Sequence, residues 1–96
     1  MNSPTPNPHI QSAQHGLDLE IALEIVAEMK GIRMRKILRE MQKPNPDINN
    51  IATWRLQLQD LGIERNLLYD ATQNKTVIQK AKTQYCEEVK YYHSHL

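Results

Sequence analysis

The stretch Leu17–Gln42 reads LDLEIALEIVAEMKGIRMRKILREMQ, and it decides the fold. Apolar residues recur along it at intervals of three and four, which is the spacing of one face of an α-helix. In the first half, the apolar stripe consists of Leu19, Ala22, Ile25, Val26 and Met29. In the second half it consists of Met34, Ile37, Leu38 and Met41, and at roughly 100° per residue this second stripe is rotated by about a quarter turn from the first. Gly31 lies at the join. The pattern therefore fits either one helix about 39 Å long or two helices that separate at Gly31.

The charges of this stretch divide at the same place. Asp18, Glu20, Glu24 and Glu28 lie in the first half, and most of the basic residues lie in the second. Acidic residues near the start of a helix and basic residues near its end complement the helix macrodipole. A mid-helix glycine costs only about 1 kcal/mol relative to alanine. We therefore expect one continuous helix.

Length and composition predict a single small helical domain. The chain has 96 residues, of which 24% are charged and 40% hydrophobic, with three glycines and no phenylalanine. These values are typical of a globular chain, and the scarcity of β-branched runs argues against a sheet. Residues 1–15 contain three prolines and no apolar periodicity, so we expect a disordered N-terminal arm at 1–15 and one helical domain at 16–96.

Turn residues divide the remainder of the chain. Pro44 and Pro46 predict a turn, because each disfavours helix in the residue before it. Asp47 is then a good N-cap for a helix over 48–61. Gly62 is placed to end that helix in the left-handed conformation.

Two arrangements fit the residues after Gly62. One is a single helix of about thirty residues. The other, which we favour, is a pair of helices at 63–73 and 77–93, with Thr76 and Gln79 spaced as a capping box. The predicted fold is thus all-α, a small bundle of three to five helices.

No pattern for catalysis, a cofactor or a metal is present. Cys86, His93 and His95 are too few and too scattered for a zinc site, and no nucleophile–base pair or glycine-rich phosphate loop is visible. The single cysteine excludes an internal disulfide. No apolar run reaches the ~18–20 residues that span a bilayer. We expect a cytoplasmic protein that is not an enzyme, with no cofactor, no metal, no small-molecule substrate and no membrane partner.

The apolar face of residues 17–29 is the basis of the leading functional hypothesis. It covers more than half of the helix circumference, which is typical of a helix with neighbours on many sides. Either this is the central core helix or a second chain covers it. The hypothesis is a non-enzymatic interaction or adaptor protein that forms a homo-oligomer or docks on a larger protein assembly. Its predicted contact residues are Leu19, Ala22, Leu23, Val26 and Met29, with Tyr91 and Tyr92 as a second contact.

The alternative hypothesis is a nucleic-acid-binding regulator. Ala27, Gly31 and Ile37 have the spacing of the steric positions of a helix-turn-helix, with Gly31 at the turn. A second, poorer match places Gly62 at the turn. The residues that would contact phosphates or guanine edges are Lys30, Arg33, Arg35, Lys36, Arg39 and Lys43.

Overall fold

The computed structural model describes the backbone of residues 8–95 and the side chains of residues 16–95. Its elements are α1 (Pro8–Met41), α2 (Ile48–Leu68), α3 (Asn74–Lys80), the π-helical turn η1 (Ala81–Tyr85) and α4 (Cys86–Ser94). No strand occurs within this range, so the predicted all-α class is confirmed. Residues 1–7 of the predicted N-terminal arm lie outside the described residues, and α1 already includes the backbone of residues 8–15.

Helix α1 is continuous through Gly31, as the charge pattern predicted. The turn that a helix-turn-helix needs at this position is therefore absent. Gly62 likewise lies within α2, and no glycine of the described range has a positive φ, so the predicted helix end at Gly62 is wrong. Continuation of α2 buries Leu68 completely. Burial of a leucine contributes about 1.5–3 kcal/mol, more than the ~1 kcal/mol that a mid-helix glycine costs.

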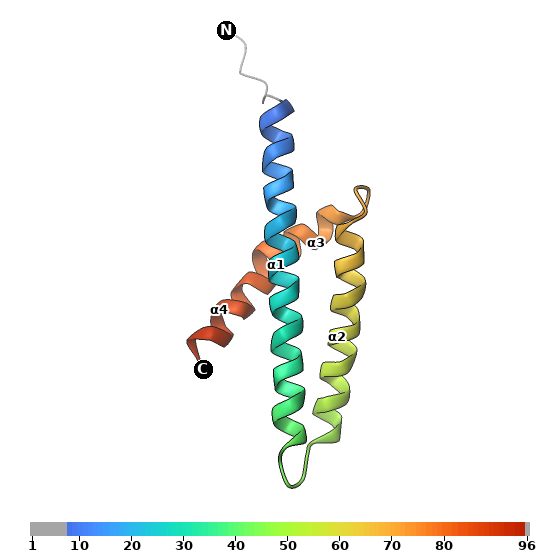
Figure 1. The fold of residues 1–96 in the computed structure, drawn as a ribbon, viewed down its shortest axis with the longest axis vertical. Helices are drawn as coiled ribbons and strands as arrows, with labels where there is room; N and C mark the ends of the chain where they lie inside the picture. Colours follow the sequence, from blue (N-terminus) through green and yellow to red (C-terminus); the bar gives the residue numbers. More distant parts are fainter. Residues whose placement is uncertain (1–7, 96) are drawn as a thin grey trace.

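The start of α2 is capped as predicted. The Asp47 carboxylate accepts a hydrogen bond of 3.1 Å from the Asn50 backbone N–H. This interaction satisfies one of the backbone donors that have no partner in the first turn of a helix. The loop between α1 and α2 is therefore short and fixed, and the two helices form an antiparallel hairpin (Figure 1).

Helix α2 ends at Leu68, and a turn over residues 69–73 separates it from α3. The Asp70 carboxylate accepts from the backbone N–H and the hydroxyl of Thr72, at 2.9 and 2.6 Å. The Asp70 carbonyl accepts from the N–H of Asn74 at 2.9 Å. Helix α3 then begins at Asn74, so the capping box predicted at Thr76 is wrong, because the turn closes before it. The predicted helix at 77–93 corresponds to the helical segment 74–94, whereas the predicted separate helix at 63–73 is wrong, because residues 63–68 belong to α2.

Helices α3 and α4 form one helical segment that contains η1. The Cys86 N–H donates to the Ala81 carbonyl, five residues earlier, which is the bond of a π-helix. This segment crosses α1 at a steep angle, well away from the loop of the hairpin (Figure 1).

The core lies where the C-terminal segment crosses the hairpin. Its buried members come from every element except α4: Ala22, Val26, Met29, Leu61, Leu68, Val77, Ile78, Ala81 and Tyr85. Toward the loop, the molecule consists of α1 and α2 alone (Figure 1). We call residues 30–59 the loop end of the hairpin; its part nearest the crossing still contacts α4 through Arg33 and Arg35.

Candidate functional site

Large apolar side chains are exposed on both helices of the loop end. On α1, Met34 is 53% exposed, Leu38 55% and Met41 51%; on α2, Ile48 is 77% and Leu56 63% exposed. The α1 residues are spaced by four and three, so they lie on one side of the helix. Single exposed apolar residues are common on protein surfaces, but here several occur on each of two adjacent helices, which is typical of a surface that a partner covers.

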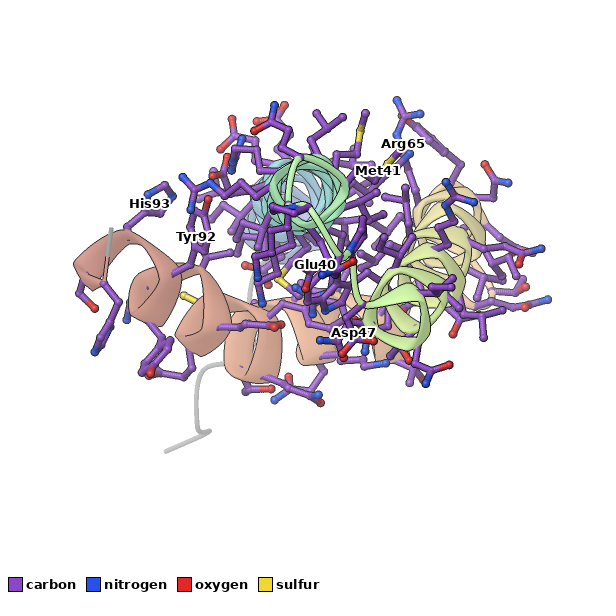
Figure 2. All side chains as sticks on the ribbon, turned by 90° about the horizontal axis from the view of Figure 1, so that it is seen from below. Glu40, Met41, Asp47, Arg65, Tyr92 and His93 are labelled. Atoms are coloured by element: carbon purple, nitrogen blue, oxygen red, sulfur yellow. The ribbon has the colours of Figure 1, made fainter. Side chains whose placement is uncertain are left out.

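The α1 stripe lies on the face of the hairpin that turns away from the C-terminal segment. Figure 2 shows Met41 on the side of α1 opposite to α4, whereas Tyr92 and His93 approach α1 from the α4 side. Met34 and Leu38 share the side of Met41 by their spacing. No helix of the described chain covers this stripe, which leaves it open to a partner.

Ile48 of α2 lies on the same side of the hairpin, whereas Leu56 lies about a quarter turn around α2 from it. Gln57 and Glu64 lie on the side of α2 that meets η1 and α4. Gln57 accepts a hydrogen bond from Arg33, which also donates to Glu88 of α4. Glu64 accepts a hydrogen bond from Tyr85 of η1. At 100° per residue, Ile48 and Arg55 lie about half a turn from those two residues. A shallow groove of about 400 Å³ runs along α2 and is lined by Ile48, Ile51, Ala52, Arg55, Leu56 and Gln59. We call the exposed stripe of Met34, Leu38 and Met41 together with this groove the loop-end apolar surface.

Arg33, predicted to contact nucleic acid, is buried in an intramolecular network. Its side chain is 9% exposed and its Nη2 lies 2.6 Å from Oε1 of Glu88. Its Nε donates to Gln57 Oε1, also at 2.6 Å. Because these bonds join α1, α2 and α4, Arg33 stabilises the fold and is not presented to a phosphate backbone.

Arg35 is partly engaged as well. Its Nε donates to the Tyr92 hydroxyl at 3.2 Å, and its Nη2 lies 3.4 Å from the Glu28 carboxylate. The hydrogen bond with Tyr92, followed by the Tyr92 and Glu28 charges, raises the pKa of Arg35 above its ordinary value. Tyr92, predicted as an interface residue, therefore holds α4 to α1, whereas Tyr91 is 65% exposed.

The other four predicted basic residues remain accessible to differing degrees. Lys43 pairs with the buried carboxylate of Glu40 at 2.9 Å. Lys30, Lys36 and Arg39 form no ion pair with any residue of the described part, and Arg55 on α2 is also exposed and unpaired there. The loop end thus keeps a cluster of uncompensated positive charges.

The apolar contact residues predicted on the first half of α1 lie in the core of the chain. Ala22 and Val26 are fully buried and Met29 is 1% exposed, while Leu19 and Leu23 pack against them. In this fold these residues contact α2 and the C-terminal segment, which is the central-helix explanation of their wide apolar face. Ala22, Val26 and Met29 are thus enclosed within the chain, whereas Leu19 and Leu23 are half-buried.

A polar cavity of about 410 Å³ lies between α1, α2 and the C-terminal segment. At its wall, the Tyr85 hydroxyl donates to Glu64 at 2.5 Å, and Lys80 lies 3.4 Å from the same carboxylate. Burial, with the hydrogen bond to Glu64, raises the pKa of Tyr85; the hydrogen bond with Tyr85, with Glu64 nearby, raises the pKa of Lys80. These bonds tie α2 to α3 and to η1.

The C-terminal histidines and Cys86 do not gather into a metal site. Within the described residues, no group of three or more His, Cys, Asp or Glu side chains is placed to hold a metal ion. Cys86 is half-buried, and His93 contacts Glu28 at 2.9 Å. The same part of the chain holds no helix that is both long and apolar enough to cross a bilayer.

Sequence reasoning identified the apolar stripe of residues 34–41 but did not assign it to an interface. The available signal was the quarter-turn offset between the two stripes of α1. Because the two stripes face different directions, the helices that cover the first stripe do not also cover the second. Comparison with protein-family models, with curated proteins and with solved structures gives no match for the chain.

Proposed function

We propose that this chain is a cytoplasmic, non-enzymatic interaction protein that docks on a protein surface, of a second copy or of a larger assembly, through its loop-end apolar surface. The observation that supports this function is the exposure of five large apolar side chains where only two helices pack together. Covering such side chains contributes about 25 cal/mol per Å² of apolar area. A third helix laid on this face would give the loop end the second layer that stable helical domains have.

The test compares Leu38→Asp with Gln42→Asp. Both positions are exposed, Leu38 near the end of α1 and Gln42 directly after it, and both changes add one negative charge, but only Leu38 belongs to the apolar surface. Molar mass by light scattering reports self-association, and anisotropy of a labelled amphipathic helical peptide with neutral flanks reports docking of another helix. We expect one of these signals in the wild type, its loss in Leu38→Asp and its retention in Gln42→Asp. A monomeric wild type that does not bind the peptide contradicts the proposal.

A second candidate function, nucleic-acid binding, is favoured by the unpaired charges at Lys30, Lys36, Arg39 and Arg55. With Lys43 these residues supply about five phosphate contacts, so the logarithm of affinity for duplex DNA should fall against the logarithm of salt with a slope of about −4.5. Lys36→Glu combined with Arg39→Glu should abolish this binding and leave every ion pair of the described structure in place. A flat salt dependence would remove this candidate.

A further inference from the structure

We propose that the loop-end apolar surface binds an amphipathic helix of a different protein, and that this helix carries acidic residues beside its apolar stripe. The inference rests on the proposed function and specifies the partner. It follows from the distribution of charge around the surface and from the shape of the loop end.

The charge around the surface is strongly one-sided. Residues 30–59 include seven Lys or Arg and two Asp or Glu, a formal net charge of +5, whereas the rest of the chain has five basic and nine acidic residues. Three of the seven basic residues pair with Glu88, Glu28 or Glu40, and the charges that remain uncompensated are those of Lys30, Lys36, Arg39 and Arg55. Glu40 is 5% exposed and pairs with Lys43, and Asp47 caps α2.

Basic side chains border the apolar residues directly. Lys30 precedes Met34 by four residues and is therefore its neighbour on the helix surface. Arg55 lines the α2 groove together with Ile48 and Leu56. Neither Lys30 nor Arg55 has an ion-pair partner in the described part of the chain. Both are available to carboxylates that flank the apolar stripe of a bound helix.

A second copy fits this surface poorly. A symmetric dimer places the same patch of each subunit against the other, and here that would bring together two sets of the unpaired side chains Lys30, Lys36, Arg39 and Arg55. Like charges across an interface oppose association. An acidic partner instead gains from every basic side chain at the rim.

The position of the apolar residues favours a helix over a lipid bilayer as the binding partner. The loop itself, residues 42–47, reads QKPNPD and contains no large apolar side chain to enter a bilayer. The apolar side chains run along the sides of α1 and α2, over about two turns of each helix. A linear partner of similar length, a helix with apolar residues every three or four positions, matches this stripe.

The experiment measures binding of synthetic helical peptides of about 20 residues, long enough to be helical in water, to the full chain by fluorescence anisotropy. The first peptide has a leucine stripe flanked by Glu, the second has the same stripe flanked by Gln, and the third is a scrambled form of the first without a stripe. At low salt we expect the Glu peptide to bind about tenfold more tightly than the Gln peptide, equivalent to about 1.4 kcal/mol. The scrambled peptide should not bind.

Two further measurements assign the preference to charge at this surface. In 1 M salt, where the Debye length is about 3 Å, the Glu and Gln peptides should bind alike. Lys30→Glu combined with Arg55→Glu should reverse the preference in favour of a Lys-flanked peptide, whereas Lys75→Glu with Lys90→Glu, which makes the same charge change outside the loop end, should not.

The outcomes distinguish the inference from the proposed function. Equal binding of the Glu and Gln peptides that Leu38→Asp abolishes would overturn the acidic partner and retain the docking function. A wild-type dimer that Leu38→Asp dissociates would also overturn the acidic partner and retain the docking function. Binding of neither peptide by a monomeric chain would overturn both. Competition of the bound Glu peptide by duplex DNA or by phosphatidylserine vesicles, with higher affinity than the peptide itself, would assign the surface to those ligands instead.

Discussion

At the scale of single residues, Tyr85 couples the fold to pH. Burial and the hydrogen bond to Glu64 raise its pKa, and the pKa of Lys80 beside it is raised too. In the unfolded chain these groups lose their protons near pH 10. The folded chain retains the protons to higher pH, so the contribution to the free energy of unfolding is complete below about pH 10 and is lost as the pH rises through the folded values.

Tyr85→Phe should therefore flatten this alkaline decrease and cost about 1.5 kcal/mol at neutral pH, the lower end for a hydrogen bond to a charged group. Urea unfolding followed across the alkaline range measures both effects. Tyr69→Phe is the matched control, because Tyr69 is 65% exposed. Equal alkaline slopes for Tyr85→Phe and the wild type would contradict the assignment.

The pairing of Arg33 was beyond sequence reasoning for a physical reason. Its partners Gln57 and Glu88 are 24 and 55 residues away along the chain. Only the packing of three helices brings them to one point. In the sequence, Arg33 is one of several basic residues on a helix. Nothing local distinguishes the buried Arg33 from the exposed Arg39.

At the scale of elements, Gly62→Ala tests whether α2 truly continues past its glycine. A Cβ at Gly62 would meet no atom within 4 Å, and alanine is favoured over glycine within a helix by about 0.5–1 kcal/mol. We expect the variant to raise the free energy of unfolding by that amount in urea denaturation. A left-handed glycine at a helix end would respond in the opposite direction, since alanine is strained at positive φ.

Local sequence signals predicted the helices correctly where no contact with a distant part of the chain opposed them. The prolines and Asp47 defined the hairpin loop, and the charge pattern of α1 predicted its continuity. The error at Gly62 arose because burial of Leu68 outweighed a local preference, and the error at Thr76 arose because the turn at Asp70 closes before it. The path of α3–α4 across the hairpin depends on contacts between distant residues, and this path determines which apolar stripe remains exposed.

At the scale of the whole molecule, the two apolar stripes of α1 should respond oppositely to an added charge. Val26 is fully buried in the core, whereas Leu38 is 55% exposed. Val26→Asp should abolish cooperative thermal unfolding, because an unpaired buried charge is among the most destabilising changes. Leu38→Asp should change the free energy of unfolding by no more than about 0.5 kcal/mol. Circular dichroism melts of both variants measure this contrast; a stably folded Val26→Asp would contradict the placement of the core.

The π-helical turn at Ala81–Tyr85 has a consequence for how the chain tolerates changes in length. A π-helical bond spans five residues where an α-helical bond spans four, so η1 accommodates one extra residue between α3 and α4. Deletion of the exposed Thr83 would let this turn become α-helical while the flanking helices keep their rotational phase. Glu88 and Tyr92 would then still face Arg33 and Arg35. A one-residue deletion within α2 would instead rotate everything beyond it by about 100°. Shortening by a single residue is therefore best tolerated at η1.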